Sequence, residues 1–140
     1  MRNVIRMGVV AAMGFVAVYL SAGVRVSADD EKLPSISEIM KKAHKKTDGY
    51  LDKLTAEAKG GKWDDAKDDA KSLLLAGEAL GKNTPPKGEA KSWEKLTAKY
   101  VDSAKGVSEA VEKKDSKAVT DSIGAIRKSC GACHSAHKGK

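Results

Sequence analysis

Two cysteines and a histidine near the C-terminus carry the clearest chemistry in this sequence. They form Cys130-Gly131-Ala132-Cys133-His134, a C-x-x-C-H pattern. This pattern is typical of c-type haem attachment, in which both thiols form thioether bonds to the haem vinyl groups. His134 would then be the proximal ligand of the iron. Three residues make most of a helical turn, so on a helix both sulfurs reach one edge of the macrocycle.

Other uses of the two cysteines have to be weighed against haem. A disulfide between residues three apart closes a very short loop and stabilises little. A redox-active dithiol usually lies where a strand meets a helix, and this sequence shows no strand pattern. A zinc site could combine Cys130 and Cys133 with His137 and His44, although it would leave His134 without a role. Haem attachment is therefore the leading hypothesis, with zinc as its main rival.

Two further residues on the predicted first helix carry side chains that can bind iron. Met40 and His44 are four residues apart, so on a helix they share one face. A thioether ligand suits an electron carrier because it raises the reduction potential, and imidazole is a strong ligand. Simpler roles stay open, namely a core methionine, a surface histidine among lysines, and a vacant sixth position.

The first 28 residues have the features of a secretory signal. Arg2 and Arg6 precede an uncharged apolar stretch from Met7 to Leu20, and Val26-Ser27-Ala28 offers small residues for cleavage. A retained membrane anchor is the alternative, because the apolar stretch approaches the length of about 20 residues that spans a bilayer. We expect cleavage, an extracytoplasmic location such as the periplasm, and no stable membrane span afterwards.

The remaining 112 residues, 29–140, are enough for one domain. All 19 acidic residues and 23 of the 26 basic residues lie in this part, which gives a net charge of +4. Lysines interspersed with acids indicate a solvated helical surface, so we expect no nucleic-acid binding. The sequence also offers no nucleophile–base pair or phosphate-binding loop, which argues against an enzyme.

Helical periodicity predicts an all-α fold with four helices. The first starts with a capping box, Ser35 to Glu38, and runs to Gly60. The second spans Trp63 to Leu80, with Gly81 as its stop, and a loop rich in proline and glycine follows. The third has its apolar stripe from Trp93 to Val111, and Asp115 or Ser116 caps the fourth, which carries the C-x-x-C-H pattern. Short connections favour an antiparallel four-helix bundle.

A helical bundle with C-x-x-C-H in its last helix resembles the class II cytochromes c, the cytochrome c-prime group, over Pro34 to Lys138. In that family an aromatic and a basic residue follow the motif, and here His137 and Lys138 occupy those positions. We expect His137 to face solvent, since it lies near the terminus. The resemblance places Met40 where low-spin members carry their distal ligand. It therefore implies Met40 as the first choice of distal ligand and His44, one turn along the same face, as the second.

The same resemblance implies what surrounds the haem. Ile36 stands where the family has an arginine, so we expect lysines such as Lys41 or Lys45 to contact the haem propionates. The aromatic residues at core spacing, Trp93 and Tyr100 among them, have no individual cofactor role in this interpretation, because such residues usually fill a bundle.

These expectations converge on a mono-haem cytochrome that carries single electrons to redox partners with acidic patches. A gas-binding haem protein with an open distal site is the alternative. A haem-free zinc module is the third hypothesis. The resemblance also implies that a homodimer can form through an exposed helix face.

Overall fold

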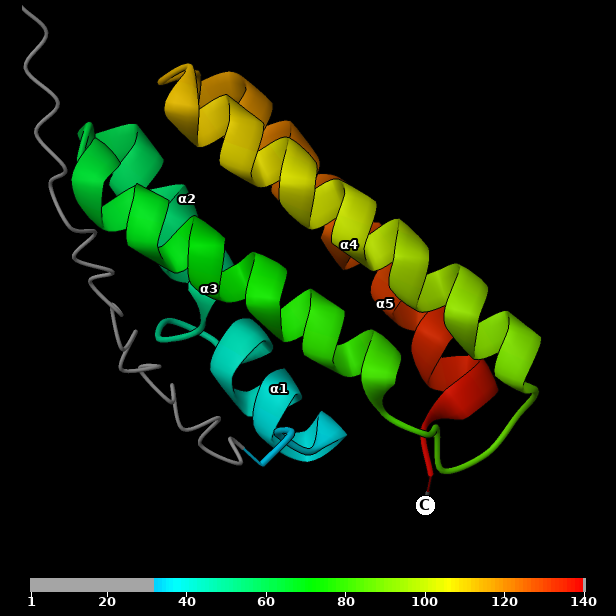
Figure 1. The fold of residues 1–140 in the computed structure, drawn as a ribbon. Helices are drawn as coiled ribbons and strands as arrows, with labels where there is room; N and C mark the ends of the chain where they lie inside the picture. Colours follow the sequence, from blue (N-terminus) through cyan, green and yellow to red (C-terminus); the bar gives the residue numbers. More distant parts are fainter. Residues whose placement is uncertain (1–31, 140) are drawn as a thin grey trace, which may run out of the picture. The chain divides into compact units, whose positions relative to one another are not determined.

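The structure is a computed structural model that describes residues 32–139, so the expected signal segment 1–28 lies outside the described residues. The described part is all-α and contains no strand. Its helices are α1 (Ile36–His44), α2 (Tyr50–Gly60), α3 (Trp63–Lys82), α4 (Ala90–Glu112) and α5 (Ser116–His137) (Figure 1). Among these helices, none combines the length and apolar composition that a bilayer-spanning segment requires.

The four longer helices enclose the main core. α3 packs against α4, α4 against α5, and α2 against both α3 and α5. The buried side chains follow the predicted apolar stripes and include Leu51, Leu54, Ala66, Leu73, Tyr100, Val107, Val111, Val119, Ile123 and Ile126. The short α1 packs against α2 and α3 near the end where α3 leads into the α3–α4 loop (Figure 1). There Ile39, Leu80 and Trp93 form a second, smaller cluster.

The predicted helix starts are confirmed at two capping residues. At the start of α1, the Glu38 amide donates to Ser35 Oγ at 3.3 Å, and the Ser35 amide donates to Glu38 Oε2 at 2.8 Å. This is the expected capping box, which satisfies two otherwise unpaired amides. At the start of α5, Asp115 Oδ1 accepts a hydrogen bond from the Ala118 amide at 2.9 Å. The predicted end of α3 at Leu80 is two residues too early, since the helix continues through Gly81 to Lys82.

The prediction of one continuous first helix is wrong, because the chain breaks between α1 and α2. Lys45 leaves the helical conformation with ψ 131°, and Thr47 has a left-handed backbone with φ 68°. Gly49 then lies so close to the end of α1 that a Cβ there would stand 2.6 Å from the Lys45 carbonyl oxygen. Only glycine fits such a close backbone approach. Thr47, which the predicted first helix would include, is instead exposed in the resulting loop.

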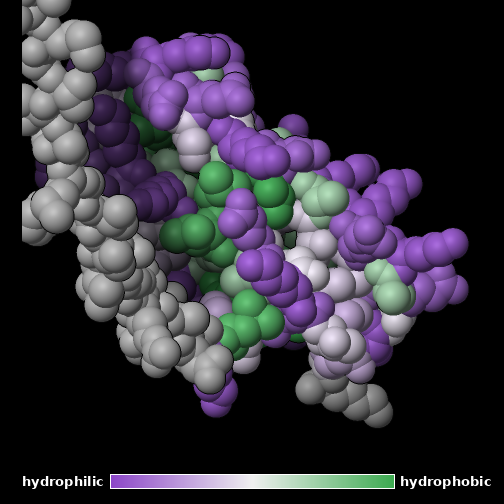
Figure 2. Space-filling view, viewed as in Figure 1, coloured by the Kyte–Doolittle hydropathy of each residue, from purple (hydrophilic) through white to green (hydrophobic). Residues whose placement is uncertain are grey.

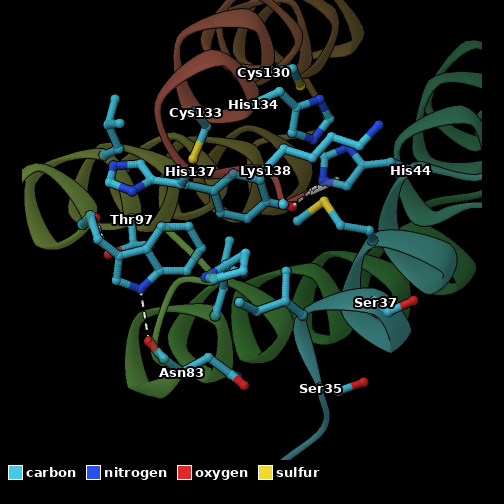
Figure 3. A pocket seen from close by; sticks show the side chains of 18 of the residues that line it. Ser35, Ser37, His44, Asn83, Thr97, Cys130, Cys133, His134, His137 and Lys138 are labelled. Carbon is cyan, nitrogen blue, oxygen red and sulfur yellow. Dashed lines mark hydrogen bonds between the residues drawn. The ribbon is translucent and has the colours of Figure 1, made fainter. Parts of the chain in front are cut away.

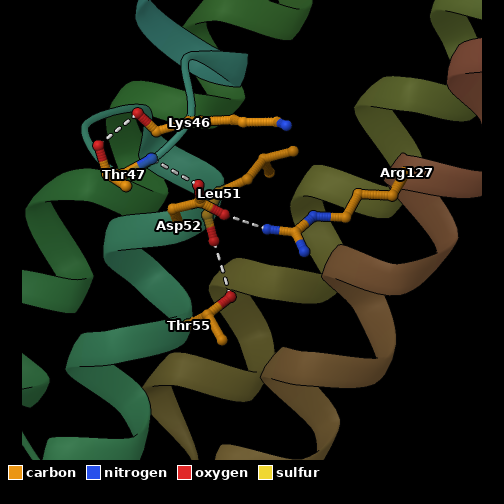
Figure 4. A network of polar contacts seen from close by, with 6 residues as sticks. All are labelled: Lys46, Thr47, Leu51, Asp52, Thr55 and Arg127. Carbon is orange, nitrogen blue, oxygen red and sulfur yellow. Dashed lines mark hydrogen bonds and ion pairs between the residues drawn. The ribbon is translucent and has the colours of Figure 1, made fainter.

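One carboxylate holds this loop in place. Asp52, in the first turn of α2, accepts a hydrogen bond from the Thr47 amide through Oδ2 at 2.7 Å. Its other oxygen pairs with the Arg127 guanidinium of α5 (Figure 4). The loop that ends α1 is therefore tied to α2 and, through Asp52, to α5. This matters for function because α1 carries Met40 and His44 whereas α5 carries the cysteines.

Candidate functional site

A cavity of about 730 Å³ lies between α1, the α3–α4 loop, α4 and the last turns of α5. Its lining brings together all five candidate residues, Met40, His44, Cys130, Cys133 and His134. These residues come from opposite ends of the sequence. The space arises because α1 packs mainly against α2 and α3, so α1 leaves a gap toward α5 that side chains do not fill.

The α5 wall carries the C-x-x-C-H residues. Cys130 and Cys133 are free thiols and half-buried, and Cys133 packs against the small cluster that contains Trp93. Burial raises the pKa of both thiols, and the neighbouring Cys130 raises that of Cys133 further. Reactive dithiols instead have lowered thiol pKa values. The pair therefore lacks the electrostatic setting of a redox-active dithiol.

The opposite wall is α1, with Met40 half-buried and His44 one turn further along. The His44 and His134 imidazoles project from α1 and α5 into the same space (Figure 3). They are close enough that the charge of His134 adds to burial, the larger cause, in lowering the pKa of His44. Nε2 of His44 lies 3.1 Å from the Tyr100 hydroxyl. Two donor groups of α1 thus face the proximal candidate across the cavity.

The expectation that His137 faces solvent is wrong. Its side chain is 2% exposed and lies between α5 and the α3–α4 loop. Nδ1 lies 2.9 Å from the Lys87 carbonyl oxygen, which can only accept, so Nδ1 carries a hydrogen. Nε2 lies 3.0 Å from the Ser92 hydroxyl. His137 therefore attaches the end of α5 to the α3–α4 loop, which lines the cavity.

Glycine makes this contact sterically feasible. Gly88 has φ 85°, and a Cβ at this position would stand 2.6 Å from Nδ1 of His137. A side chain here would be strained by the backbone and would also collide with the ring. The α3–α4 loop can approach His137 only because residue 88 has no side chain.

Several lining residues were not recognised from the sequence. Trp93 and Tyr100 were assigned to the core without a cofactor role, yet both line the cavity. Asn83 connects its rim. Its amide donates to the carbonyl oxygens of Pro34 at 3.0 Å and Ala79 at 2.8 Å, and its backbone carbonyl accepts from Trp93 Nε1 at 2.8 Å. The only signal for these roles was the position of each residue on a stripe or in the loop.

The residues proposed for zinc are not assembled. Both ring nitrogens of His137 are occupied by Lys87 and Ser92, away from His44. Within residues 32–139, no group of three or more His, Cys, Asp or Glu side chains is arranged to hold a metal ion. A Cys₂His₂ site would need at least three such ligands in one place.

No known protein family, curated protein or solved structure gives a significant match to this chain. The cavity volume lies within the range of about 300–1,000 Å³ that is usual for small-molecule and cofactor pockets. Its lining is largely apolar, with Ile36, Leu80, Trp93 and Leu96 among the contributors. The chemistry of these residues is compatible with a covalently attached haem, since the thiols could form its thioether bonds and the sulfur and imidazole groups are common iron ligands.

Exposed basic residues lie on and next to α1 and α5, the two helices that form opposite walls of the cavity. On α1 and just after it, Lys41, Lys42, Lys45 and Lys46 are all exposed. After Asp121 the chain contains no acidic residue, whereas Arg127, Lys128 and Lys138 are exposed on α5 and its end. Lys41 and Lys45, which were expected to contact the haem propionates, do not line the cavity. Lys138, the basic residue that follows the C-x-x-C-H motif, does.

Proposed function

We propose that this chain is a mono-haem c-type cytochrome that transfers single electrons in an extracytoplasmic compartment such as the periplasm. One observation carries the proposal. Cys130, Cys133 and His134 open onto one apolar cavity whose facing wall presents Met40 and His44 from another helix. A C-x-x-C-H pattern alone would be weaker, because it says nothing about space for a cofactor.

In this proposal the haem is covalently held by Cys130 and Cys133, with His134 as proximal ligand. The bound group would supply a one-electron redox couple at its iron. The chain would contribute the slot, in which Leu80, Trp93 and Leu96 exclude water from the ring. His137 would hold the end of α5, and so His134, in a fixed position. No substrate has to be turned over, so we propose a carrier and not an enzyme.

The arrangement of α2 to α5 supports a four-helix bundle of the class II cytochrome c type as the finer description of this fold. The break after α1 is a local departure from four uninterrupted helices. We also propose that residues 1–28 are a cleaved signal peptide, because c-type haem is attached after export. N-terminal sequencing of the mature protein should find Asp29 first.

Partners follow from the charge around the cavity. The exposed lysines of α1 and the basic end of α5 favour redox partners with acidic patches, whose approach would bring them to the haem edge. A homodimer is also part of the proposal. Hydrophobic residues interrupt the hydrophilic surface where α1 and α3 lie (Figure 2), and Leu75 of α3 is 55% exposed.

The direct test is expression of the full chain with a cytochrome c maturation system. We expect a red protein with one haem per chain that survives acid–acetone extraction. The double variant Cys130→Ser/Cys133→Ser should lose the covalent haem, whereas Ser135→Ala, at an exposed position of the same helix, should keep it. A colourless wild type, or one that contains stoichiometric zinc, would refute the proposal.

The alternative is a gas-binding haem protein with an open sixth position. The contact between Tyr100 and His44 Nε2 keeps one of the two distal candidates from binding iron. The sixth position would then be open if Met40 does not bind iron either. Ferric iron would then be high-spin, and the ferrous protein would bind carbon monoxide readily. A low-spin protein that resists carbon monoxide would exclude this alternative.

A further inference from the structure

Within residues 32–139, Tyr100 is the one cavity residue whose side chain makes a polar contact with the side chain of a candidate iron ligand. Its hydroxyl lies 3.1 Å from Nε2 of His44, although the two residues are 56 positions apart. The rings also meet at an angle of 61°, with centroids 5.7 Å apart. The contact therefore orients the imidazole as a whole as well as one nitrogen.

The position of Tyr100 is set by the packing of α3 and α4. Its side chain is 6% exposed. A Cβ on Gly77 would stand 2.9 Å from the Tyr100 ring, so α3 accommodates the ring only because residue 77 is glycine. A ring confined in this way cannot follow His44 if the imidazole turns toward another partner. Its hydroxyl has no other hydrogen-bond partner among the described residues, so losing His44 would leave a buried hydroxyl unpaired.

The atom that Tyr100 engages is the one that matters for coordination. If Nδ1 carries the hydrogen, the hydroxyl donates to the lone pair of Nε2, which is the lone pair that iron would need. If Nε2 carries the hydrogen, it has no lone pair to offer. In both tautomers Nε2 is unavailable while the contact lasts. Nδ1 lies next to the Cβ substituent of the ring and is the more hindered donor.

Met40 is under no such restraint. Its thioether lines the same cavity one turn earlier on α1, half-buried, and its unbranched side chain can reach in several directions. Met40 and His44 share one face of α1, but only His44 is held by Tyr100.

We propose that Tyr100 is a positioning residue that keeps His44 off the iron and leaves the sixth position to Met40. This inference rests on the proposed function, since it concerns the ligands of a bound haem. It goes beyond it by naming the residue that decides between two donors on the same helix face.

The test compares matured haem proteins by optical and electron paramagnetic resonance spectroscopy and by redox titration. The wild type should show the sulfur-to-iron charge-transfer band of methionine ligation. Tyr100→Phe keeps the ring against Gly77 but removes the hydroxyl. It should lose that band, acquire the resonance signature of two axial imidazoles, and have a lower midpoint potential, because imidazole replaces a thioether.

Two controls isolate the hydroxyl. Tyr100→Phe/His44→Ala should recover the methionine signature, since the competing imidazole is gone. Tyr50→Phe removes a hydroxyl from a half-buried tyrosine on α2 that does not line the cavity, and it should leave the spectra unchanged.

The inference is overturned if Tyr100→Phe has the spectrum of the wild type, or if the wild type already has two imidazole ligands or a high-spin iron. These results all require a red protein, so haem attachment stands in each case, whereas a high-spin wild type would also favour the gas-binding alternative over the electron carrier. A colourless protein would instead refute the inference and the proposed function together.

Discussion

The imidazole of His137 stands nearly perpendicular to the indole of Trp93, with ring centroids 5.3 Å apart and planes inclined by 72°. This contact joins the last turn of α5 to the first turn of α4. The hydrogen bonds of His137 to Lys87 and Ser92 add to this contact. Together they hold the end of α5 against the α3–α4 loop and the start of α4, next to the cavity.

We expect His137→Ala to lower the free energy of unfolding by about 2–3 kcal/mol, because it removes two hydrogen bonds and leaves a buried gap beside Trp93. Ser92→Ala removes one of these bonds and should cost about 1 kcal/mol. Urea titration followed by tryptophan fluorescence measures both. Equal stability of His137→Ala and the wild type would contradict a structural role for the imidazole.

Glu57 on α2 should make stability depend on pH. Burial, followed by the charge of nearby Asp69, raises the pKa of Glu57 from 4.5 to about 7 in the folded protein. The folded state therefore binds the proton more tightly than the unfolded state. The resulting stabilisation is complete below about pH 4.5 and is lost as the pH rises through about 7.

We expect the free energy of unfolding to fall by about 1 kcal/mol between roughly pH 5 and pH 8, since the partly exposed side chain is screened by solvent. Glu57→Gln should flatten this dependence. Glu78→Gln, at an exposed position of α3, should not. Urea titrations at several pH values provide the measurement, and an identical pH profile for Glu57→Gln and the wild type would refute the assignment.

Gly49 and Gly124 form a matched pair of glycine substitutions. A Cβ at Gly49 would meet the Lys45 carbonyl oxygen at 2.6 Å, whereas at Gly124, inside α5, it would meet nothing within 4 Å. Gly49→Ala should therefore destabilise the protein by about 2 kcal/mol or more through backbone displacement. Gly124→Ala should stabilise it by up to about 1 kcal/mol through helix propensity. Thermal unfolding of both variants checks the opposite signs.

The helical class and most of the core follow from periodicity alone. The stripes from Leu51 to Ile126 are buried as predicted, because a helix with one apolar face must bury that face. The break at residues 45–49 was missed because the apolar stripe continues across it. The turn-forming residues Thr47, Asp48 and Gly49 were the only local signal, and the buried spacing of Ala43, Tyr50 and Leu51 obscured it.

The site was predictable where its residues lie close together in sequence. Cys130, Cys133 and His134 form one motif, and Met40 and His44 are one turn apart. Tyr100 and Asn83 could not be assigned, because their contacts depend on how separate helices pack. His137 lies on the buried face of α5. Its spacing along the helix predicts this burial, whereas its closeness to the terminus predicts exposure.

The brevity of α1 has a consequence for how the cavity opens. Its nine residues are fewer than the roughly 12–15 at which an isolated helix becomes even marginally stable, so α1 is helical only while it is docked. The loop at 45–49 separates it from α2, which allows α1 to detach without unwinding its neighbour. Local unfolding of this one segment would give a rigid planar molecule a route inward while the main core stays intact. Amide hydrogen exchange should accordingly be faster in α1 than in α3 or α4.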